Sequence, residues 1–192
     1  MVAPCSSAII PGVARGRQPP PLTFRLAGLA DAEAVVSLIE SAYRGVESRR
    51  GWTTEADLLD SRRTSIEAIA EIITAPDSRV LVAETDGQLI GCCHVQSRTA
   101  GEAYLGLVSV RPHLQDRGFG RTIVSNAERE ARARWGAKLM RLRVIRQRVE
   151  LIAWYERLGY QPTGETLPFP YDNPSVIATR SDLDFVLLAK PI

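Results

Sequence analysis

The segment Val108 to Thr122 constrains the fold more than any other part of the chain. It reads Val-Ser-Val-Arg-Pro-His-Leu-Gln-Asp-Arg-Gly-Phe-Gly-Arg-Thr. An apolar strand stops at Pro112, a polar loop carries Gly118 and Gly120, and a helical pattern then runs to Trp135. Glycines let the backbone approach a ligand, and the free N–H groups of a first helical turn suit an anion. The segment therefore indicates a phosphate site, although a plain strand-to-helix connection fits the local sequence equally well.

The glycine spacing excludes two common phosphate-binding motifs. A dinucleotide fingerprint needs Gly-x-Gly-x-x-Gly and a P-loop needs Gly-Lys-Ser/Thr, and neither is present. The spacing is Gln115-x-x-Gly118-x-Gly120 after Val-x-Val-x-Pro. It resembles the acyl-coenzyme A-binding motif of the GNAT superfamily of N-acetyltransferases, whose pattern is Gln/Arg-x-x-Gly-x-Gly/Ala.

A second segment at the expected distance supports the same resemblance. Ile152 to Tyr160 reads Ile-Ala-Trp-Tyr-Glu-Arg-Leu-Gly-Tyr and is similar to the family's Ala-x-x-x-Tyr-x-x-x-Gly-Phe. One position departs from the family pattern, because Arg148 stands where many members carry Asn. The resemblance covers the chain from about Leu22 to its end.

Size and composition agree with one globular domain. The chain has 192 residues, of which 45% are hydrophobic and 24% charged, so it is long enough to bury a proper core. We expect a single domain over residues 21–192. Residues 1–20 are rich in Ala, Pro, Ser and Arg, which predicts a disordered extension, with an organelle transit peptide as the alternative.

Cysteine usage and hydropathy indicate a cytoplasmic protein without a metal. Cys5, Cys92 and Cys93 are an odd number and have no zinc-ligand spacing, which points to a reducing compartment. Adjacent Cys92 and Cys93 are expected to be small buried side chains. No apolar run approaches the roughly 20 residues that cross a bilayer.

Hydrophobic periodicity predicts alternating strands and helices. Strands are expected at 22–26, 79–84, 88–97, 103–110, 138–145, 160–165 and 183–189, and helices at 32–43, 64–73, 150–158 and from the glycine loop to Trp135. Asp31 is expected to cap the first helix, and proline-rich 167–174 to lack regular structure. This order is similar to the GNAT fold, an α/β (α+β) fold in which about four helices flank a mixed, mostly antiparallel sheet of six to seven strands. In that fold the fourth and fifth strands splay apart and coenzyme A lies in the cleft.

The resemblance implies an N-acetyltransferase that moves an acetyl group from acetyl-coenzyme A to a primary amine by direct attack in a ternary complex. A backbone N–H at Val108 or Ser109 would polarise the thioester carbonyl. Tyr155 matches the family's general acid by its position in the motif. A phenol with a pKa of about 10 gives a proton to a thiolate with a pKa of about 8.5 only slightly uphill, and positioning makes up the difference. Its alternative identity is a core aromatic. Glu102 is a candidate base acting through water, or a surface carboxylate.

The resemblance also implies which residues bind the two substrates. Cofactor-binding residues would be Val108, Ser109, Val110, Gln115, Asp116, Arg117, Gly118, Phe119, Gly120, Arg121, Thr122 and Arg148. The acceptor, a small-molecule or peptide amine, is expected to contact Trp52 and Glu55 in the loop 44–60, and Tyr171 and Asp172 in the late proline-rich segment. The mixed charges of these segments do not choose among a cationic amine, a zwitterionic amino acid and a protein terminus.

Two other functions remain open at this point. A GNAT-fold domain could bind acyl-coenzyme A as a sensor or scaffold without turnover, but it would be expected to lack Tyr155 or the glycine loop. The arginines from Arg141 to Arg148 could contact nucleic acid, yet a net charge of +2 and the lack of an aromatic platform argue against that function. A homodimer is expected only by analogy with the family.

Overall fold

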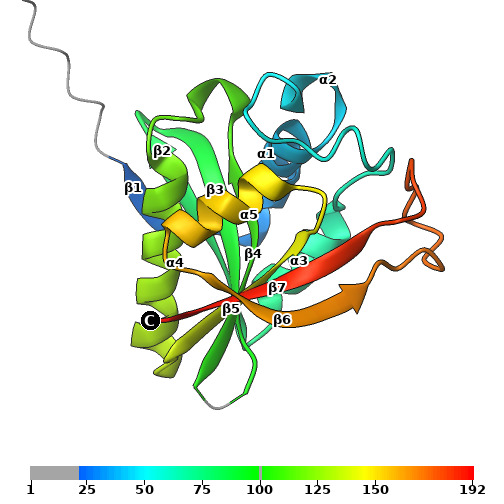
Figure 1. The fold of residues 1–192 in the computed structure, drawn as a ribbon. Helices are drawn as coiled ribbons and strands as arrows, with labels where there is room; N and C mark the ends of the chain where they lie inside the picture. Colours follow the sequence, from blue (N-terminus) through cyan, green and yellow to red (C-terminus); the bar gives the residue numbers. More distant parts are fainter. Residues whose placement is uncertain (1–21, 100) are drawn as a thin grey trace, which may run out of the picture.

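A computed structural model describes residues 22–99 and 101–192 as a seven-stranded sheet between two layers of helices (Figure 1). The strands are β1 (Thr23–Leu26), β2 (Ser78–Thr85), β3 (Gln88–Ser97), β4 (Glu102–Val110), β5 (Leu139–Ile145), β6 (Gln161–Pro168) and β7 (Asp184–Pro191). The helices are α1 (Ala32–Tyr43), α2 (Gly45–Ser48), α3 (Ile66–Thr74), α4 (Phe119–Trp135) and α5 (Val149–Arg157). The sheet order is β1-β2-β3-β4-β5-β7-β6. The extension expected at residues 1–20 lies outside the described residues.

The central strands are apolar on both faces because both faces are covered. Val80 and Val82 of β2 pack with α1 and α3, whereas Leu81 and Ala83 pack with α4 and α5. This alternation follows from the two-residue period of a strand. Cys92 and Cys93 of β3 point to opposite faces in the same way, and both are buried, as expected. Burial raises the pKa of the Cys92 thiol to about 12, so it is not a thiolate nucleophile near neutral pH.

The sequence predicted the order of the main elements correctly, but two local expectations were wrong. Asp31 does not cap α1 with its side chain; its carboxylate instead accepts hydrogen bonds from the Gly28 N–H at 2.8 Å and from the Arg25 guanidinium. The proline-rich segment is not wholly irregular, because β6 continues to Pro168. Since β6 is an edge strand, a proline there removes no ladder hydrogen bond that the sheet needs.

The sheet opens between β4 and β5. These parallel strands pair only from Glu102 to Tyr104, so the remainder of β4 has no ladder partner on that side. The splay implied by the family resemblance is therefore confirmed. On its other side β4 carries a bulge, because one residue of β3 lies opposite two residues of β4, Leu107 and Val108. Leu107 has a φ of +51°, and such a bulge re-aims the strand and its side chains.

Within residues 22–99 and 101–192, no helix is both long and apolar enough to cross a bilayer.

A buried histidine should make the fold sensitive to acid. Burial lowers the pKa of His94 from its ordinary 6.5 to about 4, and the charge of Arg98 adds to the effect. The folded protein therefore holds His94 neutral, whereas the unfolded chain protonates it, so stability is lost as the pH falls from 6.5 to 4. We expect this histidine to account for about 3 kcal/mol of the loss in the free energy of unfolding.

The measurement is urea unfolding at several pH values for the natural chain and His94→Gln. The glutamine side chain keeps a hydrogen-bonding group near Ser78, whose Oγ lies 2.8 Å from His94 Nε2. An equal loss of stability with acid in both proteins would contradict the prediction.

Candidate active site

Two cavities meet where β4 and β5 part. The first, of about 280 Å³, lies against the glycine loop and α5. The second, of about 540 Å³, lies between α3, the open part of β4 and β5, and the loop that follows β6. Five residues line both cavities: Tyr43, Val108, Arg148, Leu151 and Tyr155. Molecules bound in the two cavities would therefore both be in reach of these five residues.

The glycine loop shapes the first cavity through its backbone. Gly118 is the N-terminal cap of α4 with a φ of +83°, and Asp116 precedes it with a φ of +60°. A side chain at Gly120 would place its Cβ 3.1 Å from the Trp154 ring, so any residue larger than glycine would press against that ring. The turn presents the first N–H groups of α4 at the cavity, where partial positive charge suits a phosphate.

Most residues expected to bind the cofactor line this cavity. They are Val108, Val110, Gln115, Asp116, Gly118, Gly120, Arg121 and Arg148. The structure places four others outside the lining. Ser109 is buried and donates to the Leu107 carbonyl at 3.0 Å, Phe119 packs against the core, and the Thr122 hydroxyl donates to the Gly118 carbonyl. Arg117 is exposed beside the loop.

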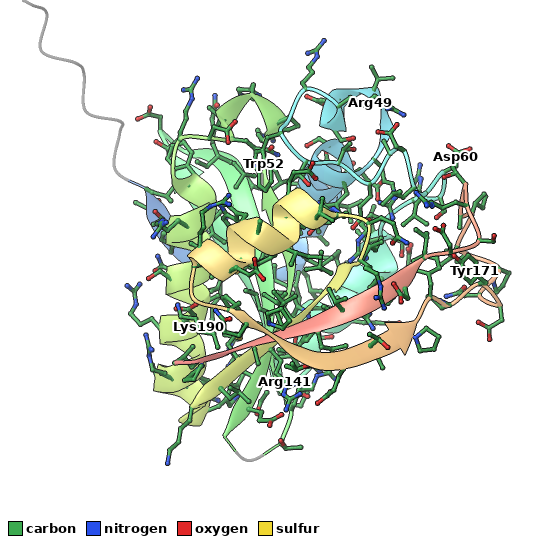
Figure 2. All side chains as sticks on the ribbon, viewed as in Figure 1. Arg49, Trp52, Asp60, Arg141, Tyr171 and Lys190 are labelled. Carbon is green, nitrogen blue, oxygen red and sulfur yellow. The ribbon has the colours of Figure 1, made fainter. Side chains whose placement is uncertain are left out.

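The side chain of Gln115 has a role that the motif did not reveal. Its Oε1 accepts a hydrogen bond from the Trp52 N–H at 3.1 Å, and its Nε2 donates to the Val110 carbonyl at 3.1 Å. The amide thus ties the loop 44–60 to the end of β4. The Trp52 ring, expected to contact the acceptor, lines the first cavity, with its centroid 6.1 Å from that of Trp154. Figure 2 shows Trp52 beside α5.

Tyr155 lies at the junction of the two cavities. It is buried, and its ring meets those of Trp154 and Tyr160 edge-on at centroid distances of 4.8 and 5.6 Å. Burial raises the pKa of Tyr155 well above 10, and nearby Tyr43 raises it further. The phenol therefore keeps its proton at physiological pH. The core and the catalytic interpretations are compatible, since the ring packs in the core while the residue borders both cavities.

Tyr43 is a site residue that sequence reasoning missed. The sequence identified it only as the end of a helix, and no motif marks it. Its hydroxyl donates a hydrogen bond to the Val108 carbonyl at 3.0 Å. Burial raises the pKa of Tyr43 to about 12, so this donor also stays protonated. The guanidinium carbons of Arg63 and Arg148 lie over its ring at 5.2 and 5.6 Å from the centroid.

Glu55, expected to contact the acceptor, is held by arginines. One carboxylate oxygen accepts from Arg148 at 2.7 Å, the other accepts from Arg44, and Arg63 lies 3.8 Å away. Burial alone would raise the pKa of Glu55, but the charges of Arg148, Arg63 and Arg44 outweigh it and hold the pKa below its ordinary value. Glu55 is therefore ionised and fully engaged. Arg148 also donates to the Thr53 hydroxyl at 2.9 Å.

Three remaining candidates line neither cavity. Glu102 is at the paired start of β4, 3.3 Å from Arg141, and Figure 2 shows Arg141 far from Trp52. Tyr171 accepts a hydrogen bond from the Leu183 N–H at 2.6 Å, and Asp172 is exposed. From this loop, Phe169, Pro170, Asn173, Ser175 and Val176 line the second cavity instead. In the described part of the chain, no three His, Cys, Asp or Glu side chains gather as a metal site.

Comparisons with known proteins place this geometry in a family. A model described as the acetyltransferase (GNAT) family matches residues 35–160. No curated protein gives a significant sequence match.

Solved structures share the fold at low sequence identity. The ribosomal-protein-S18-alanine N-acetyltransferase of Escherichia coli is 19% identical, with a TM-score of 0.66 over 90% of this chain and 94% of that one. The ribosomal-protein-alanine N-acetyltransferase of Brucella melitensis is 20% identical, with a TM-score of 0.66 over 88% of this chain and 99% of that one. The spermidine/spermine N-acetyltransferase of Vibrio cholerae is 18% identical, with a TM-score of 0.63 over 88% of this chain and 92% of that one.

Removing the Gln115 amide should loosen the loop that carries Trp52. Gln115→Leu keeps most of the side-chain volume but loses both hydrogen bonds, so we expect the free energy of unfolding to fall by about 1–3 kcal/mol. Amide hydrogen exchange at Trp52 should quicken. The β2–β3 amides serve as the internal control, and unchanged exchange at Trp52 would disprove this role for Gln115.

Neutralising Glu55 should destabilise the fold strongly. Glu55→Gln leaves Arg44 and Arg148 buried without their anion, and breaking a buried ion pair on one side costs about 3–5 kcal/mol. Chemical denaturation measures the change. Arg49→Gln, which breaks an exposed pair with Asp57, is the matched control and should leave stability nearly unchanged. Similar effects of the two substitutions would show that the Glu55 cluster contributes little.

Proposed function

Because the chain belongs to the GNAT acetyltransferase family, we propose that it transfers the acetyl group of acetyl-coenzyme A to a primary amine, with both substrates bound at once. The observation that carries this proposal is the pair of cavities that share Tyr155, Val108 and Arg148. One cavity is suited to the thioester donor and the other to the amine acceptor. Direct attack needs such an arrangement, since holding two reactants together supplies much of the rate advantage.

The residues of the first cavity fit an acyl-coenzyme A. The N-terminus of α4 behind Gly118 and the side chain of Arg121 suit the phosphates of the coenzyme. The open side of β4, near Val108 and Val110, offers backbone groups to the pantetheine arm and to the thioester carbonyl. The coenzyme supplies the acetyl group as an activated thioester.

Tyr155 is proposed to give its proton to the departing thiolate. It borders both cavities, and because burial raises its pKa it holds its proton until the thiolate departs. The raised pKa also makes the proton transfer uphill, so close positioning of the phenol beside the thiolate has to offset that cost. Tyr43 holds the bulge of β4 through the Val108 carbonyl and so positions the strand beside the thioester. Neither role requires a cysteine nucleophile.

Loss of a proton from the amine is proposed to follow from the charge of the second cavity. A free alkyl ammonium has a pKa of about 10.4, so only about one molecule in a thousand is neutral near pH 7. Arginines near the bound amine disfavour its charged form. Glu55 is ionised but both of its oxygens accept from arginines, so we assign the base to water and not to Glu55 or Glu102.

The solved structures with this fold support an amine acceptor. By their names, two of them act on an alanine of a ribosomal protein and one on spermidine and spermine. These acceptors differ widely in charge but share an amino group. At their low identities they do not choose the acceptor of this chain.

Removing the Tyr155 hydroxyl tests the proposal. In Tyr155→Phe we expect kcat to fall about a hundredfold or more, the usual contribution of a positioned acid, while the Kd for acetyl-coenzyme A stays unchanged. Thiol release is measured with the best acceptor from a panel of amino acids, polyamines, aminoglycosides and N-terminal peptides.

The matched control is Tyr160→Phe. This hydroxyl donates to Glu128 at 3.1 Å in the core, and Tyr160 lines neither cavity. The kcat of Tyr160→Phe should therefore be unchanged even if the variant is less stable. An unchanged kcat in Tyr155→Phe would remove Tyr155 as the acid. Tight binding of acetyl-coenzyme A without thiol release on any acceptor would favour a sensor.

A further inference from the structure

The second cavity has a strong excess of positive charge. Five arginines line it: Arg44, Arg62, Arg63, Arg143 and Arg148. Among the described residues of its lining, Glu55 is the single carboxylate. The whole chain, in contrast, has a net charge of only +2. The arginine excess is therefore a local feature of this cavity and not a consequence of the general composition.

The one carboxylate in this lining is already paired with arginines. Glu55 binds Arg44 and Arg148 with its two oxygens and lies 3.8 Å from Arg63. In the described part of the chain, neither Arg62 nor Arg143 forms an ion pair with a carboxylate. These two guanidinium groups therefore keep their full capacity to donate to an anion.

The free arginines come from both sides of the cavity. Arg62 lies in the loop that precedes α3, whereas Arg143 lies on β5, where its guanidinium carbon is 5.1 Å from the centroid of the Phe185 ring. Neutral hydrogen-bonding side chains also line the cavity, among them Ser61, Thr64, Ser65, Asn173 and Ser175. Guanidinium groups with hydroxyls and amides are the donor set that carboxylates and phosphates favour.

We infer that the acceptor carries an anionic group in addition to its amine, so that the second cavity takes an amino acid or an aminoalkyl phosphate and not a polyamine. The inference rests on the proposed function and names its acceptor class. The oxyanion lies among the arginines, and the amine is thereby directed toward Tyr155 and β4. A second ammonium group would instead meet the arginines and be repelled.

Two other anions fit the observations less well. Under the proposed function, the phosphates of the coenzyme lie at the glycine loop and α4, in the first cavity. A nucleic acid needs an open surface that follows many phosphates, whereas this site is a cavity of about 540 Å³ with room for a small molecule. The oxyanion of a small acceptor is the occupant that the arginines favour.

Equilibrium binding tests the inference independently of turnover. Protein saturated with coenzyme A is titrated calorimetrically with matched pairs: phenylalanine and phenethylamine, ethanolamine phosphate and ethanolamine, glutamate and spermidine. We expect the anionic member of at least one pair to bind about 10 to 100 times more tightly than its partner, the size of a charge-assisted hydrogen bond. The two oxyanion classes are distinguished by which pair responds. Tighter binding of the members without an oxyanion, or no binding by any member that carries one, would overturn the inference.

A charge-matched pair of variants assigns the effect to the cavity. Arg62→Gln/Arg143→Gln should weaken the anionic ligand about 10- to 100-fold. Because both arginines are exposed at the cavity edge, the unfolding midpoint and the Kd for coenzyme A should not change. Arg132→Gln/Arg134→Gln removes the same charge from the exposed face of α4 and should leave binding intact. Equal weakening in both variants would overturn the inference, because the ligand would then be attracted by the overall positive charge of the protein and not by the cavity.

Turnover separates the inference from the proposed function. Anions that bind but are never acetylated would leave the inference about the cavity standing and contradict the transferase. Acetylation of spermidine in preference to every anionic acceptor would confirm the transferase and overturn the inference.

Discussion

The early parting of β4 from β5 is the constraint on which the remainder of the site depends. After three paired residues, β4 must satisfy its backbone groups on that side without a neighbouring strand. Two side chains supply donors to its carbonyls: the Tyr43 hydroxyl donates to the Val108 carbonyl, and the Gln115 amide donates to the Val110 carbonyl. Buried carbonyl groups left without donors would be costly. The fold thus keeps the gap open with specific hydrogen bonds and leaves its centre free for ligands.

An ion pair connects the loop 44–60 to the start of α5 across the gap between β4 and β5. Arg148 is the N-terminal cap residue of α5, and Glu55 lies 93 residues earlier in the loop 44–60, yet their side chains are 2.7 Å apart. A buried ion pair gains little net stability because both charges lose water. Its benefit here is positional, since it fixes the loop against α5 at the junction of the cavities. The arginine found where many family members have Asn therefore has a partner of its own in this chain.

The sequence predicted the features that depend on local patterns, and it missed the contacts between residues that are far apart in the chain. Hydrophobic periodicity located the helices and strands, and the spacing of Gln115, Gly118 and Gly120 located the loop at the first cavity. No local pattern could show that Glu55 is held by Arg44 and Arg148, or that Tyr43 reaches Val108, because these partners meet only after the sheet forms. The strand through Pro168 was missed for a related reason: its proline is tolerated only at a sheet edge, and edge position is a property of the whole sheet.

The positive charge of the second cavity links binding to chemistry. Acetyl transfer needs a neutral amine, and arginines lower the pKa of an ammonium group placed among them. The same arginines would also repel an acceptor whose only charges are ammonium groups. An oxyanion on the acceptor would remove this conflict, because its attraction to Arg62 and Arg143 would offset the repulsion while the attacking amine, nearer Tyr155, would still lose its proton. Affinity for the acceptor and activation of its amine can then come from one set of side chains.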